Sequence, residues 1–397
     1  MNFDKIKDID LFNPYILIFI MVSFVLISLP IHFTSYLLPN PSYQLFLYIF
    51  LGFLFYFFGI IISKKFLFKL NFLEKLESIQ SYISIEKSNH ETIHDFKIYL
   101  KELPLFGQYS KTELILILLI LFSLFLQIIN FYFLGGIPLF SGILKAQSTG
   151  KLWFISFIIF LPSINILLAK YNRKAHYLLF FIGIILFALT GYRTTPIAIF
   201  LSCFISLYYT RHIPIKYIIL FLALISILLV TVGFVAVKSI EWQNWSLNPL
   251  ELISYRAAFT LNILDKVIYL QGIAGGKLFY YTLTGYFTHV DPRILVGEIV
   301  LSKSTSITST ILGPGLLDFG AIGMFIQMFF IGFTLKTLHI IQSYKHNIST
   351  AFYAIILAQS IIWIETGPTD IVIWIFYLIA ISIIIYTLLN LKIKINN

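Results

Sequence analysis

Arginine is rare in this chain, and three of its arginines fall where they could bind an anion. The sequence has 28 lysines and arginines in total, and five of these are arginine. Arg193 lies in a short turn between two apolar stretches, whereas Arg256 and Arg293 share one long polar segment. A guanidinium group binds phosphate oxygens bidentately and stays charged in a partly dry site. The three residues together predict a phosphate or diphosphate ligand, although any single one could instead form a structural ion pair or snorkel to a membrane interface.

Two of these arginines have neighbours that favour the same chemistry. Arg193 stands in LTGYRTTPIA, where Thr194 and Thr195 add hydroxyl donors, and an ionisable group this close to apolar spans is a functional candidate. Arg256 stands in ISYRAAFT. Ser254 is predicted to cap the N-terminus of a helix, which would place Arg256 in the first turn beside backbone N–H groups that attract anions.

The segment FTHVDPRILVGEIV, residues 287–300, holds the groups that could accept a proton. His289, Asp291 and Glu298 lie close to Arg293 there. A base that deprotonates a hydroxyl must be a carboxylate or an imidazole, so these three are candidate catalytic residues. The alternative is a polar turn in which Asp291 pairs locally with Arg293. One histidine and two acids at irregular spacing are not a typical ligand set, and no metal site is predicted.

Aromatic side chains are interleaved with these polar groups. Trp242, Trp245 and Tyr281 are candidates for stacking on the flat C–H faces of sugars, because their rings are apolar with one polar atom. The same residue types also gather in the aromatic belt at a membrane interface, which stays open as the alternative for each of them.

The composition indicates which kind of scaffold positions these residues. The chain has 397 residues, of which 59% are hydrophobic and 12% charged, and its mean hydropathy is +0.90. These values exclude an ordinary soluble enzyme, a disordered chain and a disulfide scaffold. A single cysteine, Cys203, excludes internal disulfides. It also falls inside an apolar span, where a thiol is a poor nucleophile, which argues against a membrane cysteine protease.

Continuous apolar runs predict an all-α polytopic membrane protein that forms one integral membrane domain over residues 1–397. A β-barrel would instead alternate polar and apolar residues. Each run is long enough to cross a bilayer core of about 30 Å. The ten predicted spans are residues 14–31, 44–62, 113–134, 152–169, 177–190, 194–209, 217–237, 320–338, 350–364 and 371–390.

The distribution of lysine and arginine orients these spans. Basic residues concentrate in alternate connecting segments when both termini are placed in the cytoplasm. The formal charge of +10 therefore reflects membrane topology, and no nucleic-acid partner is predicted. The start of the chain shows no small-residue cleavage site after a charged segment, so the first span is predicted to be a permanent anchor.

Two connecting segments are long. Residues 63–112 mix lysine with glutamate at helical spacing and predict a cytoplasmic amphipathic segment at the membrane surface, with a solvated linker as the alternative. Residues 238–319, between the seventh and eighth spans, predict a large, partly helical extracytoplasmic loop. Near its end, Gly313, Pro314 and Gly315 predict a break before the eighth span and close packing of helices.

Four stretches of the sequence resemble Wzy-type O-antigen polymerases, which join oligosaccharide repeat units. They are GGIPLFSGI at 135–143, TGYRTTPIAIF at 190–200, YRAAFT at 255–260 and GPGLLDFGAIGMF at 313–325. The resemblance extends over about residues 110–345. It implies a GT-C-like multispanning glycosyltransferase in the cytoplasmic membrane without a nucleotide-sugar site or other cofactor. The essential arginines of the family map best onto Arg193 and Arg256. The histidine used by related ligases has no clear match, so His289 is only a candidate.

The resemblance also implies the partners. These are a polyprenyl-diphosphate-linked oligosaccharide presented at the outer membrane face, the membrane lipids, a flippase and a chain-length regulator. Two other functions stay open at this point. One is a transporter or flippase for a lipid-linked or anionic substrate. Such proteins typically have charged residues near the bilayer midplane and an inverted repeat. The other is an O-antigen ligase, which uses the same donor with a different acceptor.

Overall fold

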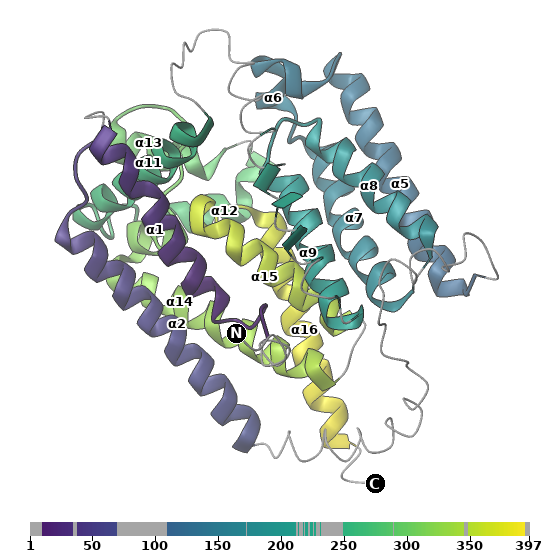
Figure 1. Ribbon diagram of the computed structural model, residues 1–397. Coiled ribbons are helices and arrows are strands. Elements are labelled where there is room, and N and C mark those ends of the chain that lie inside the picture. Colours follow the sequence, from purple (N-terminus) through teal and green to yellow (C-terminus); the bar gives the residue numbers. More distant parts are fainter. Residues whose placement is uncertain are drawn as a thin grey trace. The chain divides into compact units, whose positions relative to one another are not determined.

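The computed structural model describes residues 10–34, 38–69, 109–171, 173–211, 249–288, 290–344 and 348–393, together with residue 213 and residues 217, 219–220, 223–224, 226–227 and 231. Every regular element in these ranges is a helix (Figure 1). The helices are α1 (Ile16–Thr34), α2 (Tyr43–Lys69), α5 (Lys111–Leu134), the 3₁₀-helix η3 (Pro138–Phe140), α6 (Gly142–Gln147), α7 (Lys151–Lys170), α8 (Lys174–Ala188), α9 (Thr194–Arg211), α11 (Pro249–Tyr269), α12 (Lys277–Thr288), α13 (Pro292–Leu301), α14 (Gly313–Tyr344), α15 (Ile348–Thr366) and α16 (Ile371–Ile393).

Six of the described helices, namely α2, α5, α7, α14, α15 and α16, are long and apolar enough to cross a membrane. Two shorter apolar helices, α1 and α8, coincide with further predicted spans. The chain is therefore a multi-pass, all-helical membrane protein, as its composition predicts. The total of ten spans stays a prediction, because most of the seventh span, 217–237, lies outside the described residues. So does most of the predicted amphipathic segment 63–112, of which residues 63–69 continue α2.

The surface of α5 shows how the sequence suits a lipid environment. Its large apolar side chains face outward, with Leu118, Phe122 and Phe125 at least half exposed. Its polar residues point inward instead, and Ser123 and Gln127 are fully buried. This distribution is the reverse of a helix in a soluble protein, where the polar face meets water. Lipid is the solvent that makes it favourable.

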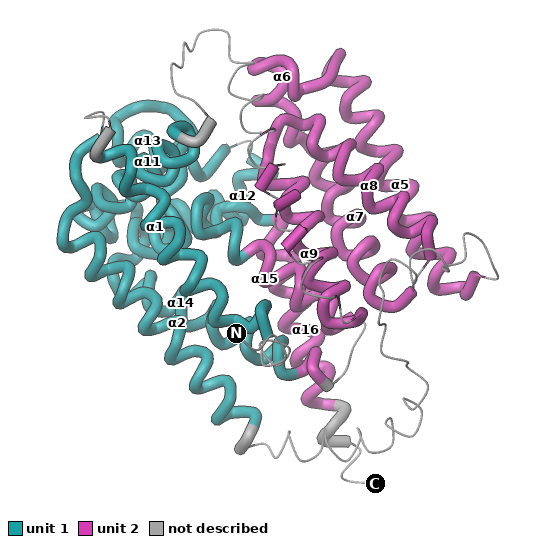
Figure 2. The backbone as a smooth tube through the Cα atoms, in the orientation of Figure 1, with its two compact units in different colours: residues 1–70, 251–340, 360–371 teal, residues 71–250, 341–359, 372–397 magenta. Residues whose placement is uncertain are grey.

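The chain divides into two compact units, which Figure 2 colours separately. Unit 1 contains residues 1–70, 251–340 and 360–371. Its helices α2 and α14 approach closely at two glycines. A Cβ atom on Gly59 would lie 2.2 Å from the carbonyl oxygen of Phe329, and one on Gly332 would lie 2.2 Å from that of Tyr56. Only glycine permits such contact between the helix backbones, which is how membrane helices gain packing energy.

Unit 2 contains residues 71–250, 341–359 and 372–397. Buried serines join α5 to α7, because Ser123 and Ser156 each donate a hydrogen bond to the other's carbonyl oxygen, at 2.8 and 2.9 Å. Asn165 on α7 donates to the Ser202 hydroxyl of α9 at 2.9 Å. These polar contacts satisfy groups that would be costly to leave unpaired in an apolar interior.

Helix α14 corrects the predicted break at Gly313–Gly315. The helix begins at Gly313, and the non-helical backbone falls instead at Phe319 and Gly320. Gly320 has φ 66° and ψ −159°, a conformation that is essentially confined to glycine. The predicted close packing is present within the bend, because a Cβ atom on Gly323 would lie 2.5 Å from the Gly315 carbonyl oxygen.

Candidate functional site

Unit 1 gathers the long polar segment at one end of its helices. Ser254 of α11 accepts a hydrogen bond from the Ile31 amide near the end of α1, and Asp265 accepts one from the Ser42 amide just before α2. The amide of Gly272 donates to the Leu316 carbonyl of α14 at 3.0 Å. We call this region the loop end of unit 1; it consists of residues 30–34, 38–43, 251–288, 290–319 and 365–370. It contains Arg256, Asp291, Arg293 and Glu298.

Helix α11 does not begin where the sequence predicts. It extends back to Pro249, so the predicted N-cap Ser254 lies inside the helix and Arg256 lies in its second turn. Proline is favoured in the first turn because it lacks the N–H that would be unsatisfied there. Ser254 is nearly buried and uses its hydroxyl to accept the Ile31 amide instead. Arg256 therefore does not share an anion site with the N-terminus of this helix, and that prediction was wrong.

Arg256 is instead oriented by a carboxylate from another helix. Its Nε donates to Glu365 Oε1 at 2.8 Å, and Glu365 is the next-to-last residue of α15. The Arg256 side chain remains 54% exposed. A guanidinium group that is held through Nε can still offer its Nη donors to a phosphate. Arg256 is thus a positioned and accessible cation at the loop end.

Asp291 and Arg293 form a local ion pair. The sequence analysis gave this pairing as the alternative to a catalytic role of the segment. Asp291 caps α13, because Oδ1 accepts from the Arg293 amide at 2.9 Å and from Arg293 Nε at 3.1 Å. Its other oxygen accepts from the Ser306 hydroxyl at 2.9 Å. Both side chains are just over one quarter exposed. Whether either also touches a substrate stays a prediction.

The other candidates at the loop end differ in how they are placed. Glu298 is exposed on α13 and accepts a hydrogen bond from Ser304 at 3.1 Å. Tyr281 is half-buried on α12 and packs beside Tyr280, with 5.6 Å between the ring centroids. His289, Trp242 and Trp245 lie outside the described residues, so their roles stay predictions.

Two carboxylates at this end were not predicted from the sequence. Glu365 and Asp370 flank the short connection between α15 and α16, in the stretch IETGPTDI. Burial raises the pKa of Asp370, the charge of Arg293 opposes that shift, and the charge of Asp291 adds to it. Asp370 therefore lies within the electrostatic field of the Asp291–Arg293 pair. The sequence does show two acidic residues on either side of Gly367 and Pro368. A short connection between two helices does not by itself indicate a functional site.

Arg193 belongs to unit 2, where two of the resembling stretches meet. The Leu139 amide donates to the Leu189 carbonyl at 2.9 Å, and Ser148 donates to the Thr190 carbonyl at 3.2 Å. Gly191 has φ 77°, and a Cβ atom there would lie 3.3 Å from Leu139 Cα. The turn before α9 is thus fixed by residues 139–148, and it presents Arg193 half-buried. Since Arg256 and Arg293 belong to unit 1, a shared site for the three arginines stays a prediction.

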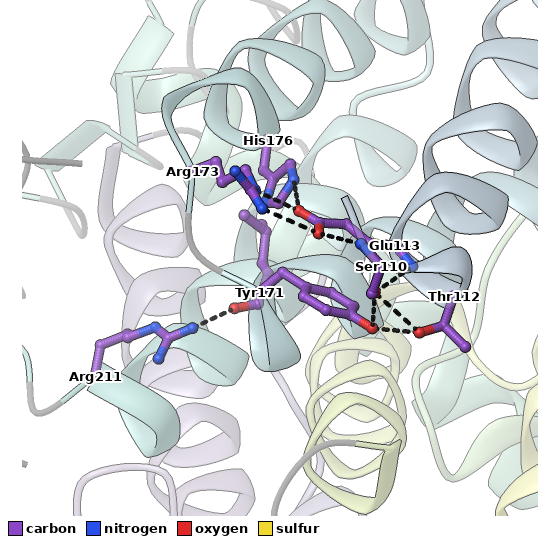
Figure 3. Close-up of polar contacts among 8 residues, drawn as sticks. Ser110, Thr112, Glu113, Tyr171, Arg173, His176 and Arg211 are labelled. Atoms are coloured by element: carbon purple, nitrogen blue, oxygen red, sulfur yellow. Dashed lines mark hydrogen bonds and ion pairs between the residues drawn. The ribbon is translucent and has the colours of Figure 1, made fainter. Parts of the chain in front are cut away.

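A second charged cluster joins the start of α5 to α8 within unit 2 (Figure 3). Arg173 Nε lies 2.7 Å from Glu113 Oε1, and His176 Nε2 lies 3.1 Å from the same oxygen. Glu113 is 2% exposed and also completes a capping box with Ser110. Tyr171 accepts a hydrogen bond from Ser110 at 2.9 Å. The cluster neutralises a buried carboxylate and fixes helix ends, which is a structural role. No group of three potential metal ligands is found among the described residues.

Comparison with known proteins agrees with the resemblance seen in the sequence. The profile of a family described as "Putative O-antigen polymerase" matches residues 10–377. An uncharacterized protein of Methanocaldococcus jannaschii is 30% identical over 207 residues, which are 52% of this chain and 48% of that protein. A second uncharacterized protein of the same organism is 24% identical over 299 residues, or 75% of this chain and 73% of its own. This chain thus spans about half of the first relative and most of the second. No solved structure matches the chain.

Proposed function

Because the chain belongs to the O-antigen polymerase family, we propose that it polymerises polyprenyl-diphosphate-linked oligosaccharide repeat units at the outer face of the cytoplasmic membrane. The observation that carries this proposal is the placement of Arg256. Its guanidinium projects from α11, is oriented at 2.8 Å by Glu365 near the end of the apolar helix α15, and is half exposed. A lipid diphosphate could enter from the bilayer and reach this cation while its sugars lie against the polar helices.

The reaction needs a cation more than it needs a nucleophilic side chain. A polyprenyl diphosphate is a good leaving group once its developing negative charge is stabilised. Arg256, Arg293 and Arg193 are proposed to supply that charge, because arginine stays protonated and binds two phosphate oxygens at once. No metal ion and no cofactor are required by this chemistry. A GT-C-like fold is proposed on the family resemblance alone.

The acceptor sugar hydroxyl must lose its proton as it attacks the anomeric carbon. Asp291, Glu298 and His289 are the bases proposed from the sequence. Trp242, Trp245 and Tyr281 are proposed to stack on sugar rings of the donor or the acceptor. A flippase would deliver the donor, and a chain-length regulator would limit the product.

A gel of lipid-linked glycans tests the proposal. It compares wild-type cells, cells that lack this protein, and deletion cells that carry the Arg256→Ala variant. We expect the deletion to reduce a long glycan ladder to single repeat units, and Arg256→Ala to do the same. Arg256→Lys should restore short chains only, because an ammonium group keeps the charge but loses the bidentate fork. Lys266→Gln, a change at an exposed position of the same helix, is the matched control and should leave the ladder intact.

Three other results would contradict the proposal. If the deletion strain makes glycan chains of normal length but no longer transfers them to their final acceptor, the protein is a ligase. Loss of outward movement of the lipid-linked unit, with no single units exposed outside, would identify a flippase. If the deletion strain makes normal glycans, the protein does not act in glycan synthesis.

A further inference from the structure

Helix α12 at the loop end of unit 1 has an outer face that is apolar. Its inner face is buried and consists of Leu278, Thr282 and Gly285. Its outer face carries large apolar side chains that are 39–67% exposed, namely Phe279, Tyr280, Leu283 and Phe287. With 3.6 residues per turn, these four positions fall within an arc of about 100°. They therefore form one continuous face, which we call the apolar face of α12.

The polar residues of α12 lie along the edge of this apolar face. Lys277 and Thr288 are exposed, and both lie roughly 60° or more beyond Tyr280 around the helix. After Lys277 the helix carries no charged residue. A helix in water would instead place polar side chains opposite its buried face. A buried face, an apolar face and a polar edge together are typical of a helix that lies in a membrane interface.

Helix α12 is attached at its start to α14, one of the helices that are long and apolar enough to cross a membrane. Asp318 of α14 is buried and accepts hydrogen bonds from the amides of Leu278 and Phe279, at 2.9 and 2.6 Å. The preceding turn is attached to the same helix, because the amides of Gly272 and Ala274 each donate to a carbonyl of α14 at 3.0 Å. The position of α12 is thus fixed by the first turns of a membrane-spanning helix.

The apolar surface of α14 begins at the point where α12 is attached. Ile322 and Ile326, one turn apart, are 70% and 65% exposed, and Phe319 at the bend is 55% exposed. Large apolar side chains on the outside of a membrane span face lipid. A Cβ atom on Gly276, the residue before α12, would lie 3.2 Å from the Phe319 ring. The lipid-facing surface of α14 therefore continues onto α12.

We propose that α12 lies in the membrane interface and that its apolar face binds the acyl chains of phospholipids. This face is buried about 5–10 Å into the boundary between headgroups and acyl chains. Lys277 lies at its edge, where a lysine can extend its ammonium group to lipid phosphates. The contact holds the loop end of unit 1 at a fixed depth in the bilayer surface. This role does not depend on the proposed polymerase function, because the exposed face of α12 and its attachment to α14 are sufficient for it.

Site-specific fluorescence quenching tests this placement in the full chain. Cys203 is fully buried, so single cysteines can be labelled with an NBD maleimide at Leu283→Cys and Phe287→Cys. The labelled protein is placed in nanodiscs that contain phospholipids alone, which excludes isoprenoid lipids as the occupant. A phospholipid with a nitroxide near the headgroup quenches from the lipid side, and iodide quenches from water. Ile326→Cys is the lipid-facing control, and Lys303→Cys, at an exposed position of the loop end, is the water-facing control.

We expect the nitroxide lipid to reduce the emission at Leu283→Cys and Phe287→Cys by as large a fraction as at Ile326→Cys. Iodide should reduce it as little as it does at that control. Thr288→Cys, on the polar edge of the same helix, should instead behave like Lys303→Cys. A second variant places a charge in the apolar face. Leu283→Asp should increase iodide quenching of the probe at Phe287→Cys, because a carboxylate is costly among acyl chains.

Several outcomes would overturn the inference. Strong iodide quenching with weak nitroxide quenching at Leu283→Cys and Phe287→Cys would place the apolar face in water. Protection from both quenchers, with a dimeric mass by light scattering, would show that a second copy of the chain covers it. Equal quenching at Thr288→Cys and Leu283→Cys would show that α12 does not insert by one face. Unchanged iodide quenching in the Leu283→Asp variant would show that the apolar character of this face does not hold the helix in lipid.

Discussion

At the scale of single residues, the loop end of unit 1 works by pairing each arginine with a carboxylate that orients it. Glu365 holds Arg256 through Nε, and Asp291 holds Arg293 through Nε. The bond through Nε leaves the terminal nitrogens of Arg256 for a ligand, which suits a diphosphate better than a mobile side chain would.

Glu365→Gln tests whether orientation of Arg256 matters for binding of the donor. We expect the KM for the lipid-linked donor to rise about two- to fivefold, since an exposed ion pair contributes up to about 1 kcal/mol. The KM for the acceptor should not change. Lys266→Gln on α11 is the control for loss of an exposed charge. An equal rise in both KM values, or none in either, would show that Glu365 does not act through Arg256.

At the scale of elements, the helices could be predicted from the sequence because lipid requires continuous apolar runs of sufficient length. The described helices α1, α2, α5, α7, α8, α9, α14, α15 and α16 all coincide with predicted spans. The ends were harder to predict, because they depend on contacts from distant parts of the chain. Ser254 has the right type for an N-cap, yet its hydroxyl accepts the amide of Ile31 and α11 starts at Pro249.

The same reason explains what was missed at the site. Arg256 and Glu365 are 109 positions apart, and no local sequence pattern predicts that they form an ion pair. Asp291 and Arg293, two positions apart, could be predicted as a local pair because the cap and the ion pair use neighbouring residues. Asp370 carries no motif at all, and the connection that contains it is held at the loop end by the Arg256–Glu365 ion pair and by the packing of Gly367 against Thr310.

The junction of α5 and α8 allows a direct measurement of what a charged cluster contributes to these elements. Glu113→Gln leaves Arg173 and His176 without their buried anion. We expect a loss of stability on the order of 2 kcal/mol and a melting temperature several degrees lower in detergent. Adding Arg173→Gln should recover part of that loss, because an uncompensated charge costs more than a neutral pair. Thr112→Ala, at an exposed neighbour, is the control, and an equal effect there would remove the special role of Glu113.

At the scale of the whole molecule, the helix ends within unit 1 agree with the alternation that the basic residues predict. The end of α1, the starts of α2 and α14, and the end of α15 all lie at the loop end. At their other ends, Asp10 lies 2.6 Å from His339, and Ser63 contacts Thr337. We therefore expect the loop end to lie on one side of the membrane. Which side it faces decides whether the proposed donor can reach it.

Thiol labelling settles that orientation, because the only natural cysteine of the chain is fully buried. Lys303→Cys places a thiol at an exposed position of the loop end, and Lys111→Cys places one at the exposed start of α5. We expect a membrane-impermeant maleimide to label the first in intact cells and the second only after the membrane is opened. The wild type, with Cys203 alone, should stay unlabelled in both conditions. The reverse pattern would place Arg256 and Arg293 in the cytoplasm, where a polymerase that acts on outward-facing lipid-linked units could not use them.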